Sequence, residues 1–416
     1  MSADEAPPLI GIIGGYGEVG AAAARCLAEA GGFRLRIGGR DGDAAELFAR
    51  ALTFARPEDD DCHGRAVDAA DASAVARFSE GCRAVLNCAG PSWLLPGATL
   101  RAVWEQGADY ADVAGTGDVP HLTGTAGDLA ERRAAVLGAG LSPGLSGMLP
   151  RLLTAGTDDA NDAATGGKSS GEKTGEGARF SGCYAGLGPF TRTGATDYLL
   201  SSRSGYGTPL GEWRDGRVVR GSVRRREECR IPGLPRPLTA VPYLPDELAQ
   251  QASRLGLARA RWYNAFDGER LLESLERHRD VPAEGAELDA AVSDVLRGAA
   301  VDAAGHLPYH VLWGRLEEPE AEGARVRRSV LVHGTDGSAL TGVVGAAAVD
   351  ALVRGRIPAG VHEAATVLPT TVLEWVGGHL PATVVTRTHE AVPADADGDA
   401  SWDLMDEELA LEEGEL

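Results

Sequence analysis

The chain has 416 residues and a mass of 43.2 kDa, which predicts two or three domains with a sizeable core. Hydrophobic residues make up 44% and charged residues 24%, proportions that exclude a disordered, collagen-like or coiled-coil chain. The formal net charge of −21 excludes a protein that mainly neutralises phosphate backbones, so no nucleic-acid partner is expected.

Cysteines and apolar runs indicate the compartment. The six cysteines are scattered without CxxC spacing, which indicates neither a disulfide framework nor a structural zinc site. No apolar run reaches about 18 residues, and the opening MSADEAPP lacks the positive charge of a signal peptide. We therefore expect a cytoplasmic protein with no membrane partner and no metal.

Lysine is almost absent, because Lys168 and Lys173 in a low-complexity stretch are the only two. Reactions that need a positioned lysine amine lose their candidate, including Schiff-base chemistry and the lysine of a short-chain dehydrogenase YxxxK pair. Arginine stays protonated near neutral pH and cannot replace it as an acid or base.

Short apolar runs alternate with helical patterns over residues 1–153. Strands are expected at 9–13, 34–39, 64–67, 84–88, 109–113 and 134–137, and helices at 19–30, 73–78 and 98–106. This alternation is typical of βαβ units, so we predict an α/β fold: a Rossmann-type doubly wound parallel sheet forming a dinucleotide-binding domain.

The rest of the chain predicts four further parts. Residues 154–178 are a flexible low-complexity linker, and 179–335 form an α+β substrate domain with an antiparallel or mixed sheet. Residues 336–390 are expected to be helices that return to the dinucleotide-binding domain. Residues 391–416 carry ten acidic and no basic side chains between Asp395 and Glu415, which indicates a disordered tail.

A glycine-rich turn joins the first strand to the first helix. Its glycines, Gly14, Gly17 and Gly20, permit a tight turn and close approach of a pyrophosphate to the helix start. Tyr16, Glu18 and Val19 complete the predicted cofactor loop. The alternative is a strand-to-helix turn without a ligand.

The second strand ends in Gly39, Arg40 and Asp41. An arginine there can fork onto a 2′-phosphate, so NADP(H) is favoured over NAD(H). The alternative is that Arg40 is solvated and Asp41 takes the ribose. Asp68, after the third strand, is expected to contact adenine or to cap the next helix.

Three later turns follow strands at the same sheet edge. Residues 88–91, after the fourth strand, are small enough to pass beside the nicotinamide ribose, although a purely structural turn is the alternative. The predicted cofactor-binding residues here are Cys88, Ala89, Gly90, Pro91 and, after the fifth strand, Gly115.

These motifs together resemble the saccharopine reductase group of NADP-binding oxidoreductases. The resemblance rests on GGYGEVG, GGR, NCAGPSWLLPG, DYADVAG and LSPGLSGML in that order, with weaker similarity to about residue 380. It implies a Rossmann domain completed by late helices, an inserted α+β domain that carries substrate and a dimer contact, and hydride transfer to a C=N or activated C=C bond.

Candidate proton donors follow from position in the chain. Tyr110 and Asp112 lie at the crevice edge, with core packing and loop capping as the alternatives. Tyr184 and Tyr198 lie on expected strands of the second domain, where a buried, hydrogen-bonded tyrosine is the alternative. His310 is a further candidate, and its helical spacing from His306 is interrupted by Pro308, which argues against a metal.

Seven arginines occur between Arg214 and Arg230, where the alternatives are a solvated hairpin and a dock for a substrate carboxylate or an acidic carrier protein. The first hypothesis is an NADPH-dependent reductase of an imine in an amino-acid-derived or carrier-tethered metabolite of a biosynthetic pathway. The alternatives are a trans-acting enoyl reductase of polyketide or lipid biosynthesis and a non-catalytic NADP(H) sensor.

Overall fold

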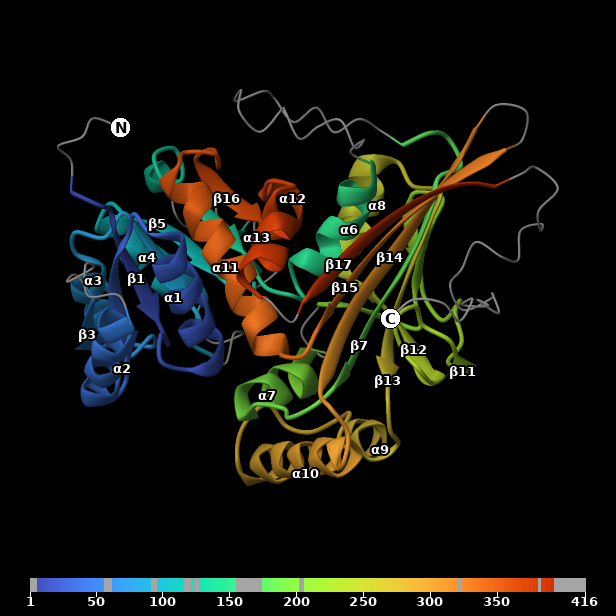
Figure 1. The fold of residues 1–416 in the computed structure, drawn as a ribbon, viewed down its shortest axis with the longest axis horizontal. Coiled ribbons are helices and arrows are strands. Elements are labelled where there is room, and N and C mark those ends of the chain that lie inside the picture. Colours follow the sequence, from blue (N-terminus) through green and yellow to red (C-terminus); the bar gives the residue numbers. More distant parts are fainter. Residues whose placement is uncertain are drawn as a thin grey trace. The chain divides into compact units, whose positions relative to one another are not determined.

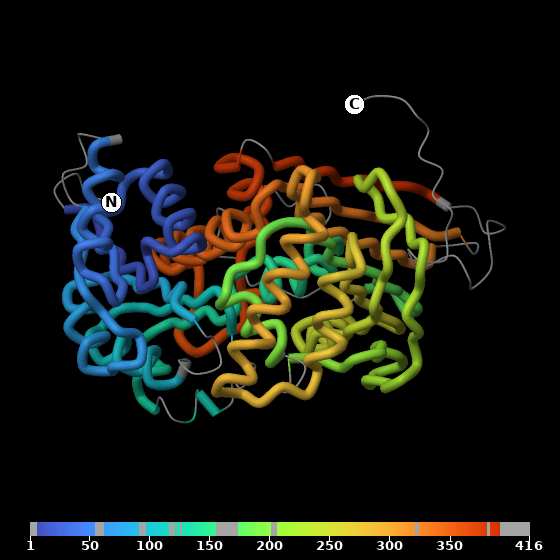
Figure 2. The backbone as a smooth tube through the Cα atoms, turned by 90° about the horizontal axis from the view of Figure 1, so that it is seen from below, coloured from blue at the N-terminus to red at the C-terminus, as the bar shows by residue number. Residues whose placement is uncertain are grey.

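The computed structural model describes residues 6–55, 62–90, 96–115, 121–122, 124, 127–154, 174–201, 206–320, 324–380 and 383–392. The chain divides into two compact units. Residues up to 148 and residues 337–381 belong to the first unit, and most of the intervening chain and residues from 382 belong to the second. Figures 1 and 2 show that early blue segments and late orange segments lie side by side in the first unit.

The first unit contains a seven-stranded parallel sheet. Its strands are β1 (Leu9–Ile13), β2 (Arg34–Gly39), β3 (Cys62–Ala66), β4 (Ala84–Asn87), β5 (Asp109–Asp112), β6 (Ala134–Leu137) and β16 (Gly360–Glu363). They are arranged in the order β16-β6-β5-β4-β1-β2-β3. The order reverses between β1 and β4, which is where doubly wound sheets bind ligands at their carboxyl edge. The predicted Rossmann-type fold is confirmed.

Helices cover both faces of this sheet (Figure 1). They are α1 (Glu18–Ala30), α2 (Gly42–Ala55), α3 (Ala72–Ser79), α4 (Pro96–Glu105), α11 (Gly337–Val353), α12 (Ala364–Val367) and α13 (Val372–His379), with a 3₁₀ turn, η2 (Gly127–Leu129). Phe78 of α3 and Trp104 of α4 share one buried cluster with Val85 of β4. A further helix, α6 (Leu145–Thr154), begins in the first unit and ends in the second.

The opposite face of the sheet is covered by α1 and α11, which come from the two ends of the chain. A Cβ atom on Gly342 of α11 would lie 2.6 Å from the carbonyl oxygen of Val19, so the two helices touch through backbone. Gly345, one turn later, lies against Leu86 of β4 and Val113. Both contacts need a residue without a side chain, which explains the glycines in this apolar helix.

Two elements of the first unit differ from expectation. Helix α2 was missing from the predicted set, although its first turn is capped by Asp41. Residues 360–363 were expected to be helical but form β16, which pairs in parallel with β6 at the sheet edge. Pro358 and Gly360, whose φ is +117°, interrupt a helix there, and the exposed edge of β6 provides backbone partners.

The second unit contains a ten-stranded mixed sheet, as predicted. Its strands are β7 (Arg179–Leu187), β8 (Gly207–Pro209), β9 (Glu212–Arg214), β10 (Arg217–Val219), β11 (Arg226–Cys229), β12 (Leu238–Pro245), β13 (Arg259–Phe266), β14 (Tyr309–Pro319), β15 (Arg325–Gly334) and β17 (Val384–Val392). The main path is β10-β9-β13-β7-β14-β15-β17, and β8, β11 and β12 branch from it. Strands β7 and β13 are parallel, with Tyr184 beside Asn264, and β14 is antiparallel to β7, with His310 opposite Gly186.

Strand β17 corrects the expectation that residues 336–390 are entirely helices returning to the first unit. Only residues 337–381 belong to that unit, and β17 is antiparallel to β15, with Thr386 opposite Leu331. The alternating β-branched residues of β17 favour a strand. Ala391 and Val392, assigned to the tail, are its last residues.

Helices α7 (Arg192–Ser201), α8 (Asp246–Leu255), α9 (Arg270–Arg277) and α10 (Ala286–Ala303) complete the second unit. Leu199 of α7 and Val292 and Val295 of α10 form a small buried cluster with Val281. A second cluster lies on the sheet itself around Tyr263 and Trp313. The first cluster supports the end of the sheet at which β7 and β13 finish (Figure 1).

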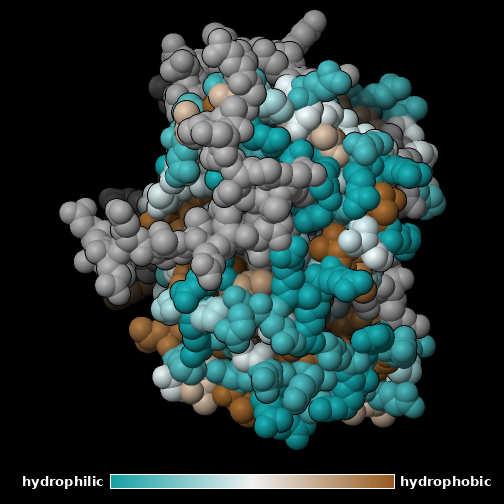
Figure 3. Space-filling view, turned by 90° about the vertical axis from the view of Figure 1, so that its right-hand side faces the viewer, coloured by the Kyte–Doolittle hydropathy of each residue, from teal (hydrophilic) through white to brown (hydrophobic). Residues whose placement is uncertain are grey.

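The remaining sequence expectations concern the linker, the tail, membrane-spanning helices and the cysteines. Residues 155–173 and 393–416, most of the expected linker and tail, lie outside the described residues. In the described part of the chain, no helix is long and apolar enough to cross a membrane. All six cysteines are free thiols. Figure 3 shows that hydrophilic side chains, in teal, predominate among the coloured residues on one face of the molecule.

Candidate functional site

The turn between β1 and α1 has the geometry of a phosphate cradle. Gly14 has a φ of +72°, and the amide of Gly17 donates to its carbonyl oxygen at 3.0 Å. A Cβ atom on Gly20 would lie 2.2 Å from the same oxygen, so only glycine lets the helix start this close to the turn. The first amides of α1 have no partner within the helix and form an anion site. A dinucleotide pyrophosphate fits this cradle.

Two predicted cofactor residues of the turn face other parts of the first unit. The carboxylate of Glu18 accepts a hydrogen bond of 3.2 Å from Ser338 Oγ, at the start of α11. Val19 presents its carbonyl to Gly342 of α11. The Glu18 side chain and the Val19 carbonyl therefore lie against α11, while the amides of the turn remain the part suited to phosphate.

The end of β2 presents one exposed cation. The ring of Tyr16 packs on Gly39, and Tyr16 Oη accepts a hydrogen bond from the amide of Asp41 at 3.1 Å. The carboxylate of Asp41 accepts from the amides of Asp43 and Ala44, both at 3.0 Å, so it caps α2. Arg40, between Gly39 and Asp41 in the chain, is exposed. This arrangement favours the guanidinium, rather than the Asp41 carboxylate, as the group that meets the ribose.

Asp68 is exposed after β3 and accepts a hydrogen bond from the amide of Ala70 at 3.0 Å. The cap of α3 is Asp71, whose carboxylate accepts from Ser73 and Ala74. The alternative that Asp68 caps this helix is therefore wrong. An adenine contact stays a prediction.

The loop after β4 approaches the glycine turn. The amide of Cys88 donates to the carbonyl of Ile13 at 2.8 Å, and a Cβ atom on Gly14 would lie 2.9 Å from the amide nitrogen of Ala89. Burial, and to a lesser degree the Asp112 carboxylate, raises the pKa of the Cys88 thiol, so the thiol is unreactive. Gly90 is exposed, and Pro91 lies outside the described residues.

Asp112 holds the loops after β5 and β6 together. Its Oδ1 accepts from the amides of Gly115 at 2.6 Å, Gly138 at 2.9 Å and Ala114 at 3.2 Å. The residue is 6% exposed, and burial raises the pKa of its carboxyl even though the three amides lower it. The sequence placed Asp112 at the correct edge of the parallel sheet. Its carboxylate is occupied by hydrogen bonds from the amides of the two loops.

Tyr110 is fully buried in the first unit. Its Oη accepts a hydrogen bond of 3.2 Å from Asn87 Nδ2, and burial followed by the Asp112 charge raises the pKa of the phenol well above its ordinary value. Asn87 Oδ1 in turn accepts from the amide of Ala89 at 3.0 Å. The pair links the ends of β4 and β5, and sequence reasoning missed this role of Asn87.

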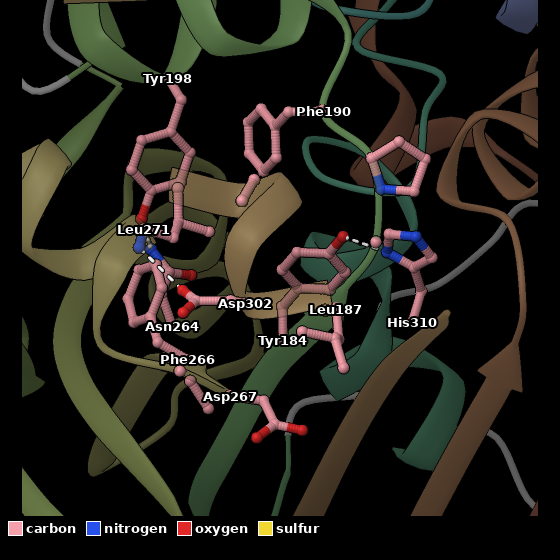
Figure 4. A pocket seen from close by; sticks show the side chains of 16 residues that line it. Tyr184, Leu187, Phe190, Tyr198, Asn264, Phe266, Asp267, Leu271, Asp302 and His310 are labelled. Atoms are coloured by element: carbon pink, nitrogen blue, oxygen red, sulfur yellow. Dashed lines mark hydrogen bonds between the residues drawn. The ribbon is translucent and has the colours of Figure 1, made fainter. Parts of the chain in front are cut away.

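The second unit brings three of the sequence candidates into one pocket. Tyr184 of β7 and His310 of β14 form a hydrogen bond of 2.7 Å between Oη and Nδ1, and their rings stack with centroids 6.1 Å apart. Tyr198 lines the same pocket (Figure 4), although it lies on helix α7 and not on a strand as expected. His306 is exposed in the turn before β14, so no helix places it beside His310.

Apolar and aromatic side chains form most of the pocket wall. Phe190, Tyr198, Phe266 and Leu271 lie across from Tyr184 in Figure 4. The empty volume is about 580 Å³, including the open solvent at the mouth. Sequence reasoning missed Phe190 and Phe266, because a lone aromatic residue gives no sign of which side of a sheet or loop it occupies.

Neutral polar groups predominate at the pocket. Burial lowers the pKa of His310 to about 4, so the imidazole is uncharged near neutral pH. Burial raises the pKa of Tyr184, and it raises the pKa of Tyr198 to about 12, so both phenols keep their protons. Asn264 accepts from Trp262 Nε1 at 3.3 Å and donates to Tyr198 Oη at 3.4 Å.

The arginine run is divided among several partners. Arg214 pairs with the fully buried Glu212, which also pairs with Arg259 and Arg261. Arg225 pairs with Glu276 at 2.9 Å. The run therefore includes structural ion pairs, and Arg217, Arg220, Arg224 and Arg230 are exposed.

Comparison with known proteins identifies the first unit. Residues 10–136 match the family model described as the saccharopine dehydrogenase NADP binding domain. This stretch contains the glycine turn, Arg40 and the loops after β4 and β5. No curated protein matches the chain.

Solved structures share only general features with the chain. The complex of Pseudomonas aeruginosa RhlG with NADP is 19% identical with a TM-score of 0.23, and it covers 27% of this chain and 55% of its own. Menthone neomenthol reductase from Mentha piperita is 20% identical with a TM-score of 0.19 over 21% and 32%. An oxidoreductase from Sinorhizobium meliloti is 11% identical with a TM-score of 0.37 over 92% and 100%. The chain thus spans about a half and a third of the first two.

Proposed function

Starting from the match of residues 10–136 to the saccharopine dehydrogenase NADP binding domain, we propose that this protein reduces the C=N bond of an imine. NADP(H) is its cofactor, and the protein is an NADPH-dependent reductase. The glycine turn would hold the pyrophosphate and Arg40 the 2′-phosphate. When bound, the reduced nicotinamide supplies hydride. The substrate is the imine of an amino-acid-derived or carrier-tethered metabolite.

The residues that line the pocket of the second unit favour a C=N substrate over a C=C substrate. Reduction of an enoyl thioester builds negative charge on a carbonyl oxygen, which a nearby cation stabilises most strongly. Reduction of a protonated imine removes positive charge from nitrogen, so the site needs acceptors and π faces instead. In the part of the chain that the structure describes, the pocket lining contains no arginine or lysine. This favours the imine.

We assign different roles to four of the five proton-donor candidates. Tyr184 and His310 belong to the substrate pocket: with the hydrogen of the imidazole on Nε2, the Tyr184 hydroxyl donates to Nδ1 and its oxygen can accept from a substrate N–H. Tyr110 and Asp112 are positioning residues that hold the loops at the edge of the parallel sheet.

A turnover assay tests the proposal. The protein is mixed with NADPH and, in separate reactions, cyclic imines or α,β-unsaturated thioesters, or with NADP+ and saccharopine-like secondary amines, and absorbance of the cofactor is followed. We expect oxidation of NADPH with cyclic imines. Oxidation with thioesters alone would favour an enoyl reductase. Tight NADPH binding without turnover of any substrate would favour an NADP(H) sensor.

The oligomeric state is a separate proposal. A homodimer follows from the resemblance to the family, in which the α+β domain carries a dimer contact. Size-exclusion chromatography with light scattering should give about twice the chain mass of 43.2 kDa. A monomer at micromolar concentration would contradict this proposal and would leave the assignment of the reaction unchanged.

A further inference from the structure

We propose that the pocket of the second unit is a binding site for a positively charged nitrogen attached to an apolar body, such as an iminium or an alkylated ammonium group. The ring cage that forms it consists of Tyr184, Phe190, Tyr198 and Phe266. The inference rests on the proposed function only where it identifies the bound cation with the reduced substrate. The binding site itself is argued from the cage.

The rings of the cage meet edge to face. Phe190 and Tyr198 have centroids 6.3 Å apart at an interplanar angle of 80°, and Tyr198 and Phe266 have centroids 6.4 Å apart at 84°. Tyr184 faces this group from the other side of the pocket, stacked on His310 (Figure 4). Perpendicular rings present both π faces and edges to one space, and a cation near a π face is attracted by the ring quadrupole.

The charged groups of the pocket are of one sign. Among the described lining residues, the full charges are the carboxylates of Asp267 and Asp302. Asp302 accepts from the amides of Arg270 at 3.2 Å and Leu271 at 2.8 Å, at the start of α9. Asp267 is paired with Arg236 and also accepts from Tyr309. These partners stabilise the carboxylates but place no cation in the lining.

An anionic ligand is therefore disfavoured in this pocket. A carboxylate or phosphate would lose its hydration and meet the Asp302 carboxylate, Asp267 being paired with Arg236, whereas a cation would gain from Asp302 and the rings. Leu187, Leu271 and Ala299 provide an apolar surface for the rest of the ligand. Among amino-acid-derived imines, the site thus selects those whose nitrogen end carries no carboxylate in the pocket.

This ligand class removes the need for a protein acid during reduction. A bound NADPH would supply hydride to the iminium carbon, and the electron pair of the C=N π bond would become the lone pair of a neutral amine. The amine then takes a proton from water. The Tyr184 oxygen can accept a hydrogen bond from the substrate N–H while the Tyr184 hydroxyl donates to His310 Nδ1, which agrees with two groups that are neutral near pH 7.

Calorimetry on the cofactor-free protein tests the site with a charged and an uncharged ligand of the same shape. Choline carries a quaternary nitrogen, and 3,3-dimethylbutan-1-ol replaces that nitrogen with carbon. We expect choline to bind about tenfold more tightly than the alcohol. Phe266→Leu and, separately, Tyr198→Leu should each lower the affinity for choline by about fivefold or more and change that for the alcohol little.

The control substitution is Phe54→Leu, at a phenylalanine that is 89% exposed in the other unit and should have no effect. Equal affinity for choline and the alcohol, no binding of either, or tighter binding of cyclohexanecarboxylate would each overturn the proposal. Because the readout is heat of binding, it does not depend on turnover. A protein that binds choline selectively but oxidises no NADPH with imines would contradict the proposed function alone.

Discussion

The phenol ring of Tyr16 lies directly on the backbone of Gly39: a Cβ atom on Gly39 would come within 2.2 Å of Tyr16 Cε1. This contact joins the glycine turn to the end of β2. Because Tyr16 Oη also accepts from the amide of Asp41, whose carboxylate caps α2, the chain at this edge is fixed on both sides of Arg40. The backbone beside the exposed Arg40 is thus fixed, which supports the proposal that its guanidinium meets the 2′-phosphate.

Replacement of Arg40 should change cofactor preference. We expect Arg40→Ala to weaken NADPH binding by about 10- to 100-fold, the range for one lost charged hydrogen-bonding group, and to leave NADH binding nearly unchanged. Calorimetry with both cofactors measures this. Arg50→Ala is the matched control, because Arg50 is 76% exposed and pairs with Glu46 on α2. Equal losses for NADPH and NADH would show that Arg40 does not read the 2′-phosphate.

A methyl group on Gly20 should disrupt the phosphate cradle. Gly20→Ala places Cβ 2.2 Å from the Gly14 carbonyl oxygen and 2.7 Å from Gly15 Cα, so the turn must move. We expect a loss of about 2 kcal/mol in the free energy of unfolding and at least about tenfold in NADPH affinity. Urea denaturation and calorimetry measure the two effects.

Gly377 of α13 provides the control for that substitution. Nothing lies within 4 Å of a Cβ atom placed there, so Gly377→Ala should stabilise the protein by up to about 1 kcal/mol through helix propensity. It should not alter cofactor affinity. If both variants behaved alike, the close approach at Gly20 would not be the cause.

Removal of the Asp112 carboxylate should loosen the two loops that it joins. Asp112→Ala leaves the buried amide of Gly138 and the half-buried amides of Ala114 and Gly115 without their acceptor, and we expect a loss of about 3 kcal/mol in the free energy of unfolding. Asp112→Asn retains one acceptor oxygen and should cost roughly half as much. Chemical denaturation compares them. A stable Asp112→Ala protein with abolished turnover and normal NADPH binding would instead indicate direct participation in the reaction.

The depressed pKa of His310 predicts a pH dependence of stability. The pKa of His310 is near 6.5 in the unfolded chain and near 4 in the folded protein. Below about pH 6.5 the unfolded chain therefore binds more protons, and stability decreases as the pH is lowered. Wild type should lose about 1 kcal/mol from this group between about pH 7.5 and 5.5, both above the sequence pI of about 4.9.

His310→Asn removes the titration while keeping a hydrogen-bonding partner for Tyr184. Urea denaturation at the two pH values should therefore show a smaller difference for this variant than for wild type. His306→Asn, at an exposed histidine four residues earlier, should retain the wild-type difference. An unchanged slope in His310→Asn would mean that the imidazole is not held neutral by burial.

Local pattern was enough to predict most of the parallel sheet. The run 134–137 is a strand with those limits, and the glycines at 14, 17 and 20 lie on the turn that they predicted. These features depend on neighbouring residues alone, so a single sequence contains the information. Strand β16 does not depend on neighbouring residues alone. Its four residues form a strand because they pair with the open edge of β6, more than 200 positions earlier in the chain.

The pocket shows the same limit. Tyr184, Tyr198 and His310 could be named as polar or aromatic residues of the second domain, but their convergence depends on β7 lying beside β14 and on the placement of α7. Asn264 and Phe266 gave no signal, since their role follows from the parallel pairing of β13 with β7. The chemical character of these residues could be predicted from the sequence, but that they lie side by side could be seen only in the fold.

The contact of Gly342 with Val19 has a consequence for biosynthesis. The helix that covers α1, and the strand that closes the β6 edge, are translated after the whole intervening second unit. The ribosome must therefore synthesise more than 360 residues before α11 and β16 can both join the parallel sheet of the first unit. Until then the nascent chain exposes the alanine-rich side of α1, which is buried in the folded protein.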